Sequence, residues 1–176
     1  GALEQQNAGA DAYNTAVGYN TGNAISTGVQ NTIIGASAGD ALTTGSNNVA
    51  VGNNALSTED AHGRNVAVGH NALMTLDAGA DAYNIAIGYN AGKLVSTGID
   101  NVIIGGLAGD AMTTGFSNTY VGKNSGGATT IGNSNVAIGD NALLTNVAAD
   151  RNIAIGVNAL YSMTAASTAD HYNIAI

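Results

Sequence analysis

A short pattern of polar and apolar residues recurs along the whole chain. Each unit opens with Asn, which is followed by a β-branched residue, then usually by Ala, and then by Val or Ile. Gly comes next wherever the chain continues, as in NTAVG at 14–18. The intervals are 17 residues except after Asn65 and Asn152, where they are 19 and 21. Counting the Asn of each unit as position 1, the opening residues are Asn14, Asn31, Asn48, Asn65, Asn84, Asn101, Asn118, Asn135, Asn152 and Asn173.

The alternation at positions 2 to 4 predicts a short β-strand in every unit. Position 12 is apolar in six units, so we expect a second, weaker strand there, closed by Gly and Thr around positions 13 to 15. Position 5 is always Gly, which predicts a bend or a close backbone approach that a Cβ atom would block. These glycines are Gly18, Gly35, Gly52, Gly69, Gly88, Gly105, Gly122, Gly139 and Gly156.

Units of this length cannot bury a core alone, but stacked units pair strand on strand along one axis. The repeat therefore predicts an all-β fold, a parallel β-solenoid or β-roll of about nine to ten 17-residue coils. In-register Asn at position 1, and at position 7 in most coils, should form amide ladders. We expect the β-branched residues to fill the interior and the small residues at positions 3 and 8 to face neighbouring chains.

A second period overlies the first, because AGADAYN occurs at both 8–14 and 78–84. We interpret the chain as one repeat domain, 1–176, with four-coil blocks at roughly 8–77 and 78–147 and a remainder at 148–176. The sequence ends inside a unit, so we expect a segment of a longer fibre. A left-handed hexapeptide helix is excluded, because it needs an aliphatic residue at every sixth position. The residue six places after position 4 is instead polar in several units, for example Asn23, Asp40 and Lys93.

Composition narrows the function classes. Aromatic residues make up only 5% of the chain, so the core must be thin. Cys is absent, which excludes disulfide bonds and thiolate chemistry. Four Lys and Arg stand far apart against 12 acids, for a net charge of −8, which argues against nucleic-acid partners and anionic membranes. No apolar run approaches the roughly 18 residues of a membrane span, so we expect no direct membrane insertion.

The unit N-[TVI]-A-[VI]-G-x-[NS]-A-[GL] resembles the head repeats of trimeric autotransporter adhesins, whose N-S-V-A-I-G unit builds a left-handed parallel β-roll. It is also similar to the collar and shaft repeats of phage tail fibres, with units of the NTAIGYNAL kind. The resemblance covers essentially the whole chain and implies a left-handed, homotrimeric assembly. The adhesin unit is typically shorter, about 14 residues, which favours the phage-like branch.

Few residues suggest chemistry. Asp60 and Asp77 both stand at position 13, which would place them about 5 Å apart in the stack, a spacing that suits a retaining glycosidase. Catalysis also needs a walled cleft, which a convex solenoid edge does not supply, so solvated charges are the preferred interpretation and a cation site is the alternative. His62, His70 and His171 fall at different coil positions without a second ligand nearby in sequence. We therefore expect no enzyme activity, catalytic residue, metal or cofactor.

Threonines at positions 13 and 14, including Thr43, Thr44, Thr113 and Thr114, could form a flat ice-binding array. The array is broken at Asp60, Asp77 and Val147, so Thr as an exposed strand-forming residue is the simpler interpretation.

The two longer units should bulge outward at 76–83 and 165–172, because stacked coils accommodate extra residues only as loops. Loops on rigid scaffolds are frequent recognition sites. The candidate receptor contacts, for a cell-surface glycan or protein, are Asp81, Tyr83, Asp170, His171 and Tyr172. Packing of the Tyr rings at the longer coils is the competing interpretation.

Taken together, these features predict a structural and adhesive extracellular segment of a phage tail fibre that supports host attachment. The head of a bacterial trimeric surface adhesin is the first alternative. A glycan-depolymerising tailspike-like enzyme and an ice-binding solenoid are weaker alternatives.

Overall fold

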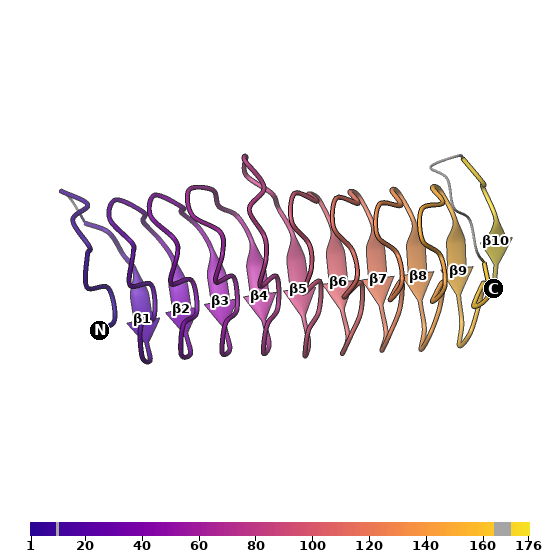
Figure 1. The fold of residues 1–176 in the computed structure, drawn as a ribbon, viewed down its shortest axis with the longest axis horizontal. Coiled ribbons are helices and arrows are strands. Elements are labelled where there is room, and N and C mark those ends of the chain that lie inside the picture. Colours follow the sequence, from indigo (N-terminus) through magenta and orange to yellow (C-terminus); the bar gives the residue numbers. More distant parts are fainter. Residues whose placement is uncertain (10, 164–169) are drawn as a thin grey trace.

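The computed structural model describes residues 1–9, 11–163 and 170–176. Its coils stack side by side along one axis (Figure 1). The described residues contain ten short strands and no helix. The strands are β1 (Thr15–Val17), β2 (Thr32–Ile34), β3 (Val49–Val51), β4 (Val66–Val68), β5 (Ile85–Ile87), β6 (Val102–Ile104), β7 (Thr119–Val121), β8 (Val136–Ile138), β9 (Ile153–Ile155) and β10 (Ile174–Ala175).

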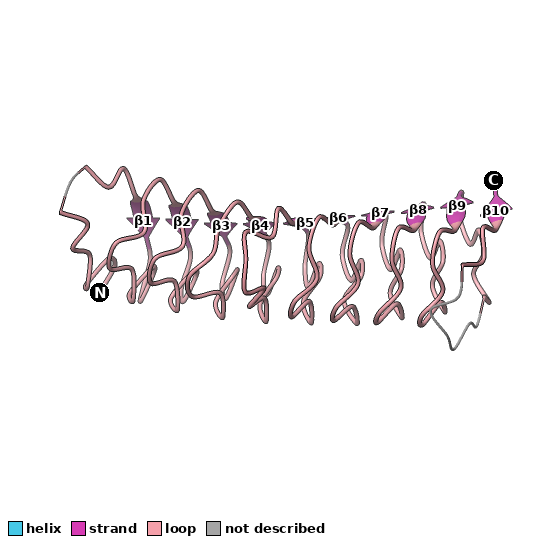
Figure 2. Ribbon diagram, turned by 90° about the horizontal axis from the view of Figure 1, so that it is seen from above, coloured by secondary structure: helices cyan, strands magenta, loops and turns pink. Residues whose placement is uncertain are grey.

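All ten strands form one parallel sheet in chain order, and each pairs with the strand of the next coil. Figure 2 shows the strands along one side of the stack and the turns on the other. Equivalent positions pair throughout, as Ala50 with Ala67 and Ala67 with Ala86. The predicted parallel β-solenoid is therefore confirmed.

The longer unit after Asn65 keeps this register, and the chain that connects β4 to β5 projects as a loop above β4 in Figure 1. The outward loop predicted at 76–83 is thus present. Of the second predicted loop, residues 165–169 lie outside the described residues.

The second strand expected near position 12 is wrong, because the described coils have turns and bends there. Isolated backbone hydrogen bonds do join the coils in this region, for example from Ser26 N to Thr43 O at 2.9 Å and from Ser96 N to Thr113 O at 2.8 Å. The surrounding Gly and Thr residues turn the chain too soon for these bonds to extend into a ladder.

The orientation of the strand is opposite to the expectation. Position 3 faces the interior and is buried from β2 to β9, whereas none of the residues at positions 2 and 4 is buried. Position 8 is also buried in most coils, including Ala38, Ala72 and Ala108. The small residues therefore let the two walls of a narrow coil approach each other, and the β-branched residues lie outside.

The coil corners depend on unusual backbone angles. The position 5 glycines have φ between +123° and +140°. A Cβ atom on Gly105 would lie 2.3 Å from the carbonyl oxygen of Gly122 in the next coil. The chain bends here, as the sequence predicts, and no side chain fits between the stacked corners.

Buried Asn side chains at position 1 connect the coils along the axis. In one rung, Asn84 Oδ1 accepts hydrogen bonds from the Asn101 backbone N at 3.0 Å and from Asn101 Nδ2 at 3.1 Å. The same Nδ2 donates to Gly115 O at 2.9 Å. A second amide ladder at position 7 includes the bond from Asn124 Nδ2 to Asn141 Oδ1, at 3.0 Å. These ladders satisfy polar groups that the narrow core would otherwise bury unpaired.

Candidate functional site

The clearest surface feature is the outer face of the sheet, formed by the residues at positions 2 and 4 of all ten units. We call it the outer stripe. Every one of its residues is Val, Ile or Thr, and none is charged. They are Thr15, Val17, Thr32, Ile34, Val49, Val51, Val66, Val68, Ile85, Ile87, Val102, Ile104, Thr119, Val121, Val136, Ile138, Ile153, Ile155, Ile174 and Ile176.

The outer stripe is solvent-accessible along its whole length. Ile87 and Ile138 are 39% and 38% exposed, and Val17 is 58% exposed. Contiguous exposed apolar surface on this scale is typical of an interaction face. Beside it, at position 6, the rings of His70 and Tyr89 stack with their centroids 5.4 Å apart.

The loop candidates form a pair of equivalent clusters with two arginines that the sequence prediction missed. In the first cluster, Asp81 forms an ion pair with Arg64, and the Arg64 guanidinium lies 5.5 Å from the centre of the Tyr83 ring. The Oδ1 atom of Asp81 also accepts a hydrogen bond from Gly63 N at 3.0 Å. These contacts tie Asp81 and Tyr83 to the preceding coil at the base of the 76–83 loop.

The second cluster repeats this arrangement at the C-terminal end. Asp170 pairs with Arg151, whose guanidinium lies 5.7 Å from the centre of the Tyr172 ring. Tyr172 Oη donates to Asp170 at 3.2 Å, and His171 N donates to Asp150 O at 3.3 Å. The charge of Asp170 raises the pKa of the Arg151 guanidinium.

A sequence signal for these arginines does exist. They are the only Arg residues in the chain, and each stands directly before the Asn that opens a longer unit. The longer unit that follows each Arg ends in Asp-x-Tyr, and stacking of the coils places this Asp-x-Tyr beside the Arg.

The other candidate residues take different places. Asp60 lies with Glu59 and His62, and the ligand atoms of these three side chains are all within 4.8 Å of one another. The exposed Thr hydroxyls are used between coils: Thr43 Oγ1 donates to Asp60 O at 2.9 Å, and Thr113 Oγ1 donates to Thr130 O at 3.1 Å. Sequence reasoning missed Glu59, although it interrupts the apolar residues at position 12.

No pocket is found in the part of the chain that the structure describes. Nor do the described residues include a helix long and apolar enough to cross a membrane. No family model, curated protein or solved structure matches the chain.

Proposed function

We propose that this chain is a stiff segment of an extracellular fibre, of the phage tail-fibre kind, that assembles as a homotrimer. The observation that carries the proposal is the outer stripe, an uncharged Val, Ile and Thr face that runs the length of the solenoid. Three such faces turned toward a common axis would remove this apolar surface from water, which favours association. The resemblance of the repeats to trimeric fibres and adhesins supplies the number of chains and the left-handed winding.

The stack itself suits a fibre. Its backbone and amide hydrogen bonds run between coils, so successive units join into a continuous column. Repetition lengthens such a column without a new core, because each coil contacts only its neighbours. The same column carries the 76–83 loop on its side, where it would be accessible to a host surface.

The assembly is tested by light scattering coupled to size-exclusion chromatography. We expect a particle of about 52 kDa, three times the 17.3 kDa chain. Ile87→Lys places a charge in the outer stripe and should yield monomers, because burial of an unpaired charge is strongly unfavourable. Leu94→Lys is the matched control in the same coil: Leu94 is exposed but lies outside the sheet, so the trimer should persist. A folded wild-type monomer or dimer would contradict the trimer.

The attachment role is tested with a glycan array and with host cells. We propose Asp81 and Tyr83 as contacts of the first loop, and Asp170, His171 and Tyr172 as contacts near the second. A variant whose 76–83 loop is shortened by two residues should lose binding that the intact segment shows. Equal binding by both proteins, or binding by neither, would make this segment a passive spacer.

A further inference from the structure

A charged side chain occupies an interior position of the third coil. Position 12 faces the core, where Ile25, Leu42 and Met112 are fully buried in their coils. In the third coil this position is Glu59, whose side chain is also fully buried. Buried carboxylates are rare without a compensating cation.

The partners of Glu59 are two backbone N–H groups and one imidazole ring, that of His62. Its Oε1 atom accepts a hydrogen bond from His62 N at 3.0 Å, and Oε2 lies 3.5 Å from Ala78 N. The ring atom His62 Nδ1 lies 3.3 Å from Oε1. This Nδ1 is buried and has no hydrogen-bond partner. A carboxylate oxygen and an imidazole nitrogen thus face each other without a hydrogen bond between them.

The eighth coil shows that the turn itself needs no charge. There, position 12 is Asn146, whose Oδ1 accepts a hydrogen bond from Ala149 N at 3.0 Å, three residues ahead, as Glu59 does with His62 N. An uncharged amide therefore supplies the acceptor that this turn requires. The turn of the third coil therefore does not require the charge of the Glu59 carboxylate or the imidazole of His62.

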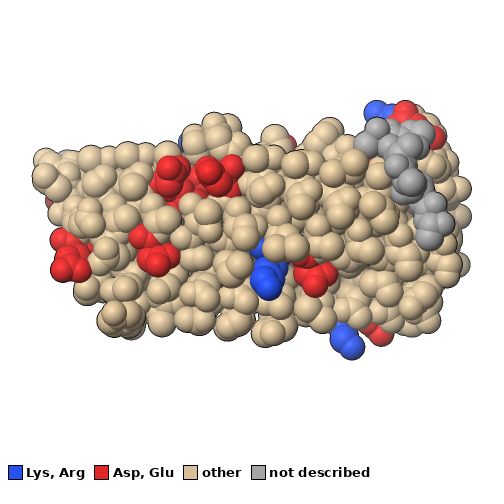
Figure 3. Space-filling view, viewed as in Figure 1, with Lys and Arg blue, Asp and Glu red and all other residues tan. Residues whose placement is uncertain are grey.

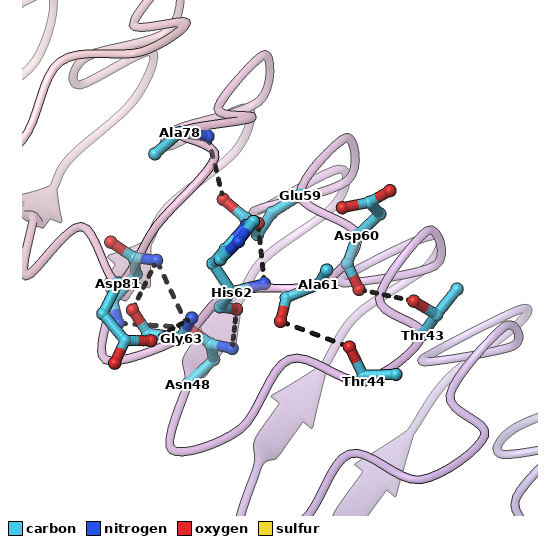
Figure 4. Close-up of polar contacts among 11 residues, drawn as sticks. Thr43, Thr44, Asn48, Glu59, Asp60, Ala61, His62, Gly63, Ala78 and Asp81 are labelled. Carbon is cyan, nitrogen blue, oxygen red and sulfur yellow. Dashed lines mark hydrogen bonds and ion pairs between the residues drawn. The ribbon is translucent and has the colours of Figure 1, made fainter.

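The backbone around the cluster is held in place by side chains of the preceding coil and of the same coil. Thr43 Oγ1 donates to Asp60 O at 2.9 Å, Thr44 Oγ1 donates to Ala61 O at 3.3 Å, and Asn48 Nδ2 donates to His62 O at 3.2 Å (Figure 4). Acidic side chains gather on the rim over β2 to β4 of a face with few charges (Figure 3). The cluster is therefore fixed at its backbone and open on the side of the exposed Asp60.

We propose that Glu59, Asp60 and His62 form a Zn²⁺ site. An imidazole nitrogen with two carboxylates is a ligand set that Zn²⁺ accepts, whereas Mg²⁺ and Ca²⁺ prefer oxygen ligands alone. Zn²⁺ bonds of about 2.0–2.2 Å place tetrahedral ligands roughly 3.4 Å apart. The three ligand atoms, all within 4.8 Å of one another, need only a small closure, which the exposed Asp60 side chain can supply. Solvent takes the fourth position.

The experiment is a calorimetric titration of Zn²⁺ into the chelator-treated, tag-free chain. We expect one Zn²⁺ per chain with a Kd on the order of 10 µM or tighter. Bound Zn²⁺ should also raise the denaturation midpoint by linkage. The decisive variant is Glu59→Asn with His62→Ala, which installs the Asn and Ala that the eighth coil already uses, so the turn should fold. This variant should lose the calorimetric signal and the Zn²⁺-dependent shift.

Single substitutions separate this site from others in the chain. Asp60→Asn should weaken Zn²⁺ binding by at least about tenfold, and neither His70→Ala nor His171→Ala should change it. A wild-type chain that binds no Zn²⁺ at about 1 mM, or undiminished affinity in the Glu59→Asn, His62→Ala variant, would overturn the proposal. Mg²⁺ that binds as tightly as Zn²⁺ would overturn it as well.

Discussion

Two positions of the coil, the position 5 corner and the position 12 wall, show opposite tolerance of sequence change. The corner is Gly in all nine units that reach it. The wall varies widely, from apolar residues to Glu59, Thr129 and Asn146, and all three of these polar side chains are buried. Both positions repeat once per coil, so stacking alone does not explain why only one of them is uniform.

The difference lies in what each position contacts. At every corner from Gly18 to Gly139, a Cβ atom would meet the backbone of the next coil, which cannot move without shifting the stack. The wall meets other side chains, whose volumes can change together. The solenoid is therefore constrained most where backbone packs on backbone.

The corner should give the largest effect of any single substitution considered. Gly105 has φ +140°, and its Cβ would lie 2.3 Å from Gly122 O. Gly105→Val should therefore lower the free energy of unfolding by about 4 kcal/mol, combining backbone strain of ~1–3 kcal/mol with overpacking of ~1–3 kcal/mol. Urea denaturation measures the loss.

Gly106→Ala is the matched control, because a Cβ atom added at Gly106 would meet nothing within 4 Å and the φ of this residue is not positive. It should change the free energy of unfolding by less than about 0.5 kcal/mol. Similar losses in both variants would show that the corner is not specially constrained.

Positions 3 and 9, which lie close together inside the coil, should tolerate paired changes that they do not tolerate singly. Tyr120 is fully buried at position 3, where most coils have Ala, and a Cβ on Gly126 would lie 2.6 Å from its ring. Four coils instead combine Ala at position 3 with Leu at position 9: Ala50 with Leu56, Ala67 with Leu73, Ala137 with Leu143, and Ala154 with Leu160. A large residue at one position thus accompanies a small one at the other.

Tyr120→Ala should cost about 3 kcal/mol through the cavity it leaves, and Gly126→Leu about 2 kcal/mol through overpacking. The double variant should cost at least about 1 kcal/mol less than the sum of the two. Leu is compatible with the local backbone, since Gly126 has φ +59° and Leu143 has φ +54°. Additive losses in denaturation experiments would show that the two positions do not share volume.

Much of this architecture could be predicted from the spacing of Asn and Gly. The period indicates the parallel stack, because only units in register bring Asn84 onto Asn101. The direction of the side chains could not be predicted, since alternation is unchanged when the two faces of a strand are exchanged. Ala rather than Val fills most of this interior because the coil is narrow. The width of the coil is set only when the whole coil closes, so the pattern of a single strand does not reveal it.

The contacts of the loop residues and of Glu59 were predicted less well than the fold, because these contacts join different coils. Asp81 and Tyr83 were identified by their place in a long unit. Their partner Arg64 lies 17 residues before Asp81 and becomes visible only when the coils are aligned. Glu59 was missed because position 12 is apolar in only six units, with Thr129 and Asn146 as further exceptions, so a polar residue there does not stand out.

Substitutions in contacts between exposed side chains should cost less than those at the corner or at positions 3 and 9. The Arg64 and Asp81 side chains are 48% and 38% exposed, so water screens their ion pair. Arg64→Gln should lower the free energy of unfolding by less than about 1 kcal/mol, and about 1 M salt should reduce that loss further. Asp81→Ala should cost more than Arg64→Gln, because Gly63 N also loses its acceptor Oδ1. Denaturation at low and high salt checks both values. A salt-independent loss from Arg64→Gln as large as that from Gly105→Val would reverse this ranking and place the main coupling between coils on their outer surface.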